Sequence, residues 1–181
     1  MRIICGKYAK REISVVGRTR PLLTRIRQCV FDILGPIEGL TILDLCAGSG
    51  SFGLEALSRG AKFVYFFEED LETARNLMQT LSKWQVNNAK VAVKNVLYLP
   101  NSDIKVDLIF LDPPFGHKYT EQIMSRVVKK GWTDESTKLI VRTDYVIEED
   151  VEYWKQIRHE TIGISFIHYY RRKECADNGC D

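Results

Sequence analysis

The apolar residues of the chain fall into two kinds of segment that alternate along most of its length. In one kind they form short, almost continuous runs, which are typical of parallel strands covered on both faces. In the other kind they recur every three or four positions, which is typical of helices with one buried face. This alternation predicts an α/β protein with a doubly wound, mostly parallel sheet. The predicted core strands cover residues 40–45, 62–67, 89–94, 106–111 and 138–141.

Helical spacing predicts one helix before the first strand and others between or after the strands. The first helix starts near residues 17–21, with Pro21 in its first turn, and ends at residues 35–36. Its Arg25 and Arg27 lie off the apolar stripe and are expected to remain available to a phosphate or a cofactor. The stripe itself consists of Leu22, Ile26, Cys29, Val30 and Ile33. The other helices are expected from Leu54 onwards, over residues 71–84 and 119–130, and around Ile147, Val151 and Trp154.

Both ends of the chain have the pattern of a β-hairpin. Residues 2–5 and 12–16 predict short strands around a basic tip at residues 6–11. Because two strands alone are marginally stable, this hairpin must pack against another element. Residues 157–162 and 164–170 predict a second hairpin about Gly163, and the polar residues after it are expected to fray.

Length and composition indicate one globular domain, since 181 residues with 45% hydrophobic and 28% charged residues can bury a proper core. No apolar run approaches the ~18 residues of a membrane span, and the opening residues lack the long apolar region of a secretory signal. The five cysteines contain no C-x-x-C pair. We therefore expect reduced thiols, including Cys175 and Cys180 in the tail, no bound metal and a cytoplasmic protein.

The net charge is only +2, but basic residues are concentrated near the N-terminus. Residues 2–27 contain eight arginines and lysines against one acidic residue, Glu12, which gives this segment a net charge of +7. Such a segment fits a nucleic-acid phosphate backbone and, equally, a solvated surface. The candidate RNA-contacting residues are Arg2, Lys7, Lys10, Arg11, Arg18, Arg20, Arg25 and Arg27.

A glycine-rich turn, residues 44–50, joins the first core strand to the following helix. Glycine lets the backbone approach a ligand closely, and the free N–H groups of a helix N-terminus attract a negative group. Gly48, Gly50 and Gly53 match the G-x-G-x-x-G pattern of dinucleotide binders, and acids follow at Glu68 and Glu69. One interpretation is therefore a nicotinamide-dependent oxidoreductase.

The carboxylate of Asp44, at the end of the first strand, favours a different ligand. At ~4 Å a pyrophosphate would be repelled by about 4 kcal/mol, even at an effective dielectric constant of about 20. A cation that also carries a carboxylate suits the site better, because the helix N-terminus accepts that carboxylate. S-adenosylmethionine has this charge pattern. Its expected contacts in the turn are Asp44, Ala47, Gly48, Ser49 and Gly50.

Polar side chains also follow the next two core strands, at the edge where doubly wound sheets bind ligands. Glu68 comes directly after the second strand, and its carboxylate is expected to accept hydrogen bonds from both ribose hydroxyls of an adenosine. Asn95 comes after the third strand. Its amide either bonds the edge of the adenine ring or is a plain turn residue.

The stretch Asp112-Pro113-Pro114-Phe115 follows the fourth core strand and brings Asp112 to the same edge as Asp44. The prolines lack N–H groups but keep their carbonyls, so this turn is rich in acceptors. Acceptors on both N–H bonds of an exocyclic base amine would align this poor nucleophile with a sulfonium methyl group and stabilise the developing charge. Phe115 would stack on a flipped base. The four residues predict an amino-methyltransferase acting on guanine N2, adenine N6 or cytosine N4, with Asp112 also contacting the donor.

The chain as a whole resembles the RsmD-type family of ribosomal RNA methyltransferases. The matching segments are residues 1–4, 6–7, 19–21, 44–50, 53–61 and 112–115, with Arg25, Arg27, Phe31 and Glu68. The resemblance implies a seven-stranded methyltransferase sheet, S-adenosylmethionine as donor, and methylation of a guanine N2 in the 16S RNA of the small ribosomal subunit. It also implies that the basic N-terminal part helps to hold RNA. That family usually has an acid where this chain has Asn95.

On this interpretation, residues 1–36 form an RNA-contacting hairpin and helix, residues 37–173 the methyltransferase catalytic domain, and residues 174–181 a polar tail. We expect a monomer that acts on the small subunit or its 16S RNA in the cytoplasm, without a membrane or a metal. Two alternative functions are considered. The first is an oxidoreductase, but no other part of the sequence supplies a partner for hydride transfer. The second is a non-catalytic RNA-binding module, but such a module would not need the paired acceptors of the Asp112 turn.

Overall fold

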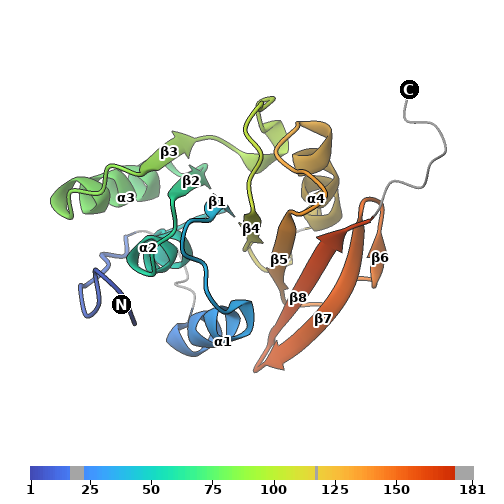
Figure 1. Ribbon diagram of the computed structural model, residues 1–181, viewed down its shortest axis with the longest axis horizontal. Helices are drawn as coiled ribbons and strands as arrows, with labels where there is room; N and C mark the ends of the chain where they lie inside the picture. The colour runs from blue at the N-terminus through green and yellow to red at the C-terminus, as the bar shows by residue number, and fades with distance from the viewer. Residues whose placement is uncertain (17–22, 117, 174–181) are drawn as a thin grey trace.

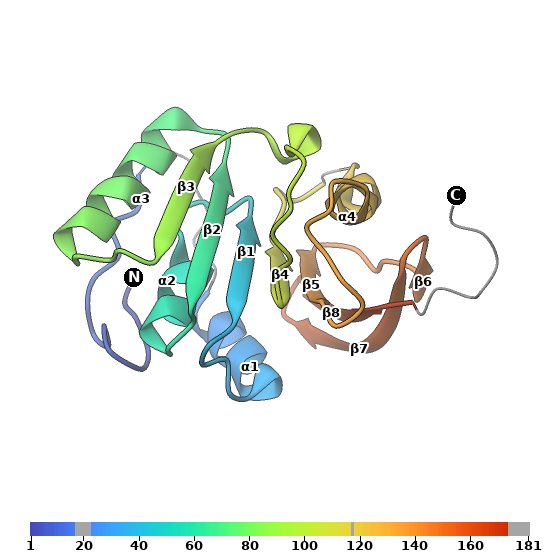
Figure 2. The same cartoon turned by 45° about the horizontal axis from the view of Figure 1, so that its top comes forward.

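An eight-stranded sheet runs through the residues that the structure, a computed structural model, describes: 1–16, 23–116 and 118–173 (Figure 1, Figure 2). Its strands lie in the order β3-β2-β1-β4-β5-β8-β7-β6. They are β1 (Thr41–Leu45), β2 (Phe63–Glu68), β3 (Ala89–Val93), β4 (Leu108–Leu111), β5 (Lys138–Thr143), β6 (Asp150–Val151), β7 (Trp154–Ile162) and β8 (Ser165–Arg172). Strands β1 to β5 are parallel, and β8, β7 and β6 continue the sheet antiparallel. The predicted mostly parallel, doubly wound sheet is confirmed.

Helices cover both faces of this sheet: α1 (Thr24–Leu34), α2 (Ser51–Ser58), α3 (Leu71–Lys83), the short 3-10 helix η1 (Val96–Tyr98) and α4 (Thr120–Lys129). Successive strand side chains point to opposite faces, so the core has two halves. Ile42 and Phe66 pack on the side of α1, α2 and α3, whereas Leu43 and Phe67 pack on the side of α4. None of the described helices is long and apolar enough to cross a membrane.

The segment around Ile147, Val151 and Trp154 is not a helix, and that prediction is wrong. It contains a turn, the short edge strand β6 and the start of β7, and β6 raises the strand count from the expected seven to eight. All three side chains are nevertheless buried, and the Trp154 indole N–H donates to the Met124 carbonyl (2.8 Å). Over so few residues, a turn that leads into an edge strand buries side chains at the same spacing as a helix. The terminal hairpin after it, β7 and β8, is confirmed.

The N-terminal hairpin has a single β-bridge, between Arg2 and Glu12, instead of two paired strands. As expected, it packs against another element, which is α2. The Lys7 N–H donates to the Ser58 carbonyl (2.8 Å), and the Tyr8 N–H donates to Ser58 Oγ (2.9 Å). Gly6 has φ +85°, and a Cβ there would lie 1.8 Å from the Ser58 carbonyl oxygen. Only glycine therefore allows this contact.

Arg27 is not available to a phosphate or a cofactor, and that prediction is wrong. Its side chain is fully buried between α1, α2 and the hairpin. Nη2 donates to the Arg2 carbonyl (2.5 Å), and Nε lies 3.6 Å from Glu55 Oε2. The apolar stripe identified the face of α1 that meets the sheet, but the hairpin covers a second face of the same helix. The predicted start of this helix near residues 17–21 is wrong, because α1 begins at Thr24 with Leu23 as its N-cap. Residues 17–22 themselves lie outside the described residues.

Candidate active site

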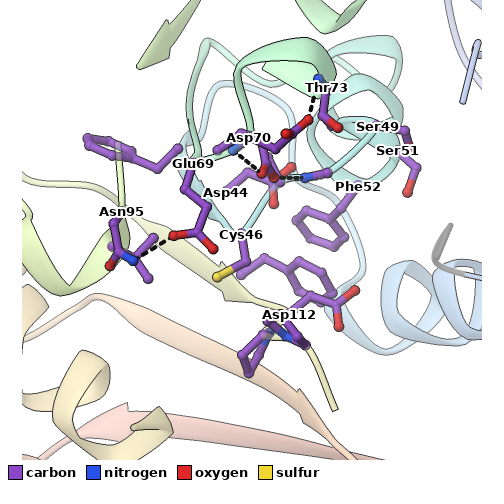
Figure 3. Close-up of a pocket in the computed structure, with 18 of the residues that line it drawn as sticks. Asp44, Cys46, Ser49, Ser51, Phe52, Glu69, Asp70, Thr73, Asn95 and Asp112 are labelled. Atoms are coloured by element: carbon purple, nitrogen blue, oxygen red, sulfur yellow. Dashed lines mark hydrogen bonds between the residues drawn. The ribbon is translucent and has the colours of Figure 1, made fainter. Parts of the chain in front are cut away.

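A cavity of about 750 Å³ lies at the carboxyl ends of β1 to β5 (Figure 3). Its size is within the range of roughly 300–1,000 Å³ found for small-molecule sites, and its position is the usual one for doubly wound sheets. Nearly all of the predicted donor-binding and catalytic residues line it: Asp44, Ala47, Gly48, Ser49, Glu68, Asn95, Asp112, Pro113, Pro114 and Phe115. Gly50 does not line it, although its neighbours Ser49 and Ser51 do.

Gly50 and Gly53 are required by packing inside the protein. Gly50 precedes α2 with φ +73°, and a Cβ there would lie 2.4 Å from a methyl carbon of Leu77. A Cβ at Gly53 would lie 2.2 Å from the Phe66 ring and 2.9 Å from Asp44 Oδ2. Packing alone therefore explains why positions 50 and 53 are glycines, and the match to the dinucleotide pattern does not indicate a bound pyrophosphate.

Asp44 is almost fully buried at the end of β1, with 1% exposure. Its Oδ2 accepts the N–H of Gly53 (3.0 Å). Burial raises the pKa of Asp44 well above its usual value, and the nearby Asp112 and Glu68 raise it further. A positively charged ligand would relieve this repulsion and favour the ionised form. The cavity is thus suited to a cation.

Glu68 holds the glycine-rich turn against the end of β2. Its two carboxylate oxygens accept the N–H groups of Gly48 (2.7 Å) and Asp70 (2.9 Å). Each oxygen of a carboxylate has a second acceptor site, so the predicted ribose contact is compatible with these bonds. Asn95 is the cap of η1: its Oδ1 accepts the Leu97 N–H (2.8 Å), and its Nδ2 donates to Glu69 (2.6 Å; Figure 3). Glu69 also lines the cavity, a feature that the sequence reasoning did not use.

Asp112 follows β4, beside the end of β1, where its N–H donates to the Leu45 carbonyl (3.3 Å), and its side chain lines the cavity. Both of its oxygens accept hydrogen bonds from Nη1 of Arg142 (2.9 and 2.8 Å). Burial raises the pKa of Asp112 to about 6, and the charge and hydrogen bonds of Arg142 limit that rise. Sequence reasoning missed Arg142. The available signal was an arginine directly after the apolar run of the fifth core strand.

The prolines and Phe115 continue from Asp112 along the cavity wall. Pro113 is buried and Pro114 is exposed, while Phe115 is partly buried with its ring 4.9 Å from the Arg142 guanidinium carbon. The next turn is held by Asp144, whose carboxylate accepts the Gly116 N–H (3.1 Å). Acidic and aromatic groups therefore meet at one side of the cavity.

Most of the candidate RNA-contacting residues that the structure describes are exposed. These are Arg2, Lys7, Lys10, Arg11 and Arg25, whereas Arg18 and Arg20 lie outside the described residues. Arg2 pairs with Glu12 (2.8 Å), and the guanidinium of Arg11 lies over the rings of Tyr8 and Trp84. The hairpin tip contacts Ser58, at the end of α2 remote from the cavity.

Fold and site together define the class of the protein. Its features are those of a class I methyltransferase: a parallel sheet extended by antiparallel strands, a glycine-rich turn after β1, an acid at the end of β2 and the Asp-Pro-Pro-Phe turn after β4. The model of the family described as "Conserved hypothetical protein 95" matches residues 1–171, and the chain belongs to this family. The resemblance to the RsmD-type family is thereby confirmed.

Curated relatives and solved structures agree with this assignment. The chain is 33% identical to ribosomal RNA small subunit methyltransferase D of Haemophilus influenzae, covering 94% of the chain and 93% of that protein. It is 28% identical to the protein of the same name from Escherichia coli K12, covering 100% and 94%. The solved structure of the Escherichia coli protein yhhF superposes with a TM-score of 0.87 at 29% identity, covering 96% of this chain and 98% of that one.

Proposed function

We propose that the chain is an S-adenosylmethionine-dependent methyltransferase that acts on the exocyclic N2 amine of a guanine in the 16S RNA of the small ribosomal subunit. The observation that carries the proposal is that Asp112, with its Pro-Pro-Phe turn, lines the same cavity as Asp44 and the glycine-rich turn. Two relatives named as ribosomal RNA small subunit methyltransferase D support this substrate class.

The residues of the cavity fit this donor. Asp44, Glu68 and Asp112 give the cavity a negative potential that suits the ammonium and sulfonium groups, and the start of α2 suits the carboxylate. Glu68 keeps acceptor sites for the ribose hydroxyls. We assign the adenine edge to Asn95 and Glu69, which are hydrogen-bonded to each other and both line the cavity. When bound, S-adenosylmethionine supplies an electrophilic methyl group, and its sulfur keeps the electron pair of the broken bond.

The residues after β4 act on the amine. The ionised Asp112 carboxylate and the Pro113 carbonyl accept its two N–H groups and aim the nitrogen lone pair at the methyl carbon. As the N–C bond forms, positive charge develops on the nitrogen, and Asp112 stabilises it until one proton passes through the Asp112 carboxylate to solvent. Phe115 stacks on the guanine once the base has left its own stack. No general base is needed before the bond forms.

The exposed cations of the hairpin, Lys7, Lys10 and Arg11, supply sequence-independent attraction to RNA phosphates. They lie on a part of the chain with a net charge of +7, counted over residues 2–27. In this scheme the hairpin holds the RNA and the cavity selects the base.

The test is methylation in vitro. The protein is incubated with labelled donor and with small subunits from cells that lack it, and the 16S RNA is digested to nucleosides. The expected product is N2-methylguanosine, strongly reduced when Asp112→Ala replaces the wild type. Label in N6-methyladenosine or N4-methylcytidine would move the substrate to another base. Binding of NAD without binding of S-adenosylmethionine would overturn the enzyme class.

A further inference from the structure

Arg142, on β5, connects its strand to both neighbouring strands, β4 and β8, by side-chain hydrogen bonds at the candidate active site. It lies near the end of β5, beside β4, and its Nη1 donates to both oxygens of Asp112 (2.9 and 2.8 Å). Its Nε donates to Oγ of Ser165, the first residue of β8 (3.2 Å). The Arg142 side chain is 8% exposed and that of Asp112 is 16% exposed. Anchored by Ser165, the guanidinium has little freedom to move.

The same guanidinium also lies against the ring of Phe115, with Cζ 4.9 Å from the ring centroid. Such contacts between a guanidinium and an aromatic face are attractive and are stronger when shielded from water. Asp112 and Phe115 are the two side chains that the proposed reaction assigns to the amine and to the base. One residue outside the Asp-Pro-Pro-Phe turn therefore contacts both.

A buried ion pair is a weak source of stability, because removing two charges from water costs about as much as their attraction returns. A well-packed apolar pair would hold β4 and β5 together equally well. The arrangement is better explained by what it does to Asp112. A single nitrogen that contacts both carboxylate oxygens restricts the rotation of the carboxylate, and each oxygen keeps a further acceptor site.

We propose that Arg142 is a positioning residue for methyl transfer, which acts by fixing the Asp112 carboxylate, ionised and correctly oriented, and by setting the plane of the Phe115 ring. This inference depends on the proposed function, because it assigns Arg142 a part in that reaction.

The charge of Arg142 gives the proposal a pH signature. The groups that face Asp112 are Asp44 on β1 and the Cys46 thiol in the glycine-rich turn, in addition to Arg142 on β5. Asp44 disfavours a second negative charge, and burial raises the pKa of Cys46 so that the thiol is neutral. Among the described residues that face Asp112, Arg142 is the one that favours its ionised form. Without the charge of Arg142, Asp112 keeps its proton to higher pH and cannot stabilise the positive charge that develops on the amine.

The experiment compares Arg142→Gln, Arg142→Lys and Ser165→Ala with the wild type, using full-length protein and undermethylated small subunits. Arg142→Gln is expected to lower kcat at pH 7 about ten- to hundredfold, with the affinity for S-adenosylmethionine changed less than about threefold. The pH below which kcat falls (the acidic limb of the kcat profile) should rise by about one pH unit or more, so that activity recovers in part at alkaline pH. Arg142→Lys keeps the charge but loses the Nε contact with Ser165 and the planar group against Phe115. It should keep the wild-type fall of kcat at low pH while lowering kcat itself.

Ser165→Ala removes only the hydrogen bond from Arg142 Nε to Ser165 Oγ. This variant still tests the inference if the Arg142 variants do not fold. It should lower kcat by a few-fold without moving the acidic limb. The matched control is Arg158→Gln on β7, an exposed arginine that pairs with Glu160, and it should leave kcat and its pH profile unchanged. A folded Arg142→Gln variant with wild-type kcat and pH profile would overturn the inference, and so would a Ser165→Ala variant with unchanged kcat. If the wild type itself does not methylate RNA, the proposed function is overturned, which is a different result from the failure of the inference about Arg142.

Discussion

Glu55 on α2 and Arg27 on α1 form an ion pair in which neither side chain is exposed to solvent, with Nε and Oε2 3.6 Å apart. The same carboxylate accepts the N–H groups of Ile4 (2.8 Å) and Cys5 (3.1 Å) and pairs with Arg59 (2.8 Å). One buried acid therefore joins the hairpin, α1 and α2. Since α2 begins at the cavity, the position of the hairpin is tied to that of the site.

Replacing this acid should destabilise the protein strongly. Glu55→Ala leaves the Arg27 guanidinium buried without its counter-charge and removes the acceptor of two N–H groups. Breaking a buried pair in this way costs about 3–5 kcal/mol. Urea unfolding monitored by fluorescence measures the loss. The control is Glu12→Ala, which removes an exposed pair with Arg2 and should barely move the midpoint. Equal urea midpoints for the two variants would show that Glu55 does not hold the hairpin, α1 and α2 together.

Asp112→Ala should lower turnover strongly but preserve donor binding. The carboxylate is expected to contact the amine, whereas Asp44, Glu68 and the glycine-rich turn supply most of the donor contacts. Loss of one such electrostatic contact lowers kcat by about 10²–10³-fold. Single-turnover methylation and calorimetric titration with S-adenosylmethionine separate the two effects. Asp103→Ala, at an exposed aspartate outside the cavity lining, serves as the control. Persistent turnover in Asp112→Ala would remove this residue from the mechanism.

The wild-type enzyme should lose activity as the pH falls through about 6. Burial raises the pKa of Asp112 to that value, so the carboxylate is ionised above it and protonated below it. Only the ionised form stabilises the positive charge that develops on the amine, so kcat should drop about tenfold for each pH unit below 6. Single-turnover rates between pH 5 and pH 8, at saturating donor, measure this limb. A rate that stays constant down to pH 5 would contradict the assigned role.

Neutralising the hairpin tip should weaken RNA binding without affecting the donor. Lys7→Gln, Lys10→Gln and Arg11→Gln each remove one exposed cation. Each should reduce the slope of log K against log salt concentration by about one, uniformly across RNA sequences. Filter binding to small-subunit RNA at several salt concentrations measures the slope. Lys155→Gln, an exposed lysine on β7, should leave it unchanged. If the three tip variants behave like Lys155→Gln, the RNA contact lies elsewhere.

The parts of the site that sequence reasoning found are those with local signals. Asp44, Glu68 and Asp112 each stand at the end of an apolar run, and parallel strands bring such ends to one edge. Periodicity therefore predicted both the sheet and the cavity. The same reasoning failed around Trp154, where a turn and a two-residue strand produced the burial spacing of a helix.

The residues that were missed or misassigned owe their roles to contacts between distant parts of the chain. Arg142 pairs with Asp112 across 30 residues, and the hairpin N–H groups reach Glu55 across about 50. In the sequence, Arg27 reads as a polar position on a helix and Glu55 as an ordinary helical acid. Only the packing of α1, α2 and the hairpin shows that these two charges are buried together.

The hairpin tip and the cavity lie at opposite ends of α2, whose eight residues span about 12 Å. Because Ser58 holds the tip and Glu55 holds the segment before it, the distance between the tip and the cavity is set by the fold. An RNA held at both places must present a phosphate and a flipped guanine at that spacing. The fixed spacing would then select the RNA by its shape. A short loop oligonucleotide with the correct sequence should be a far poorer methyl acceptor than the folded small ribosomal subunit.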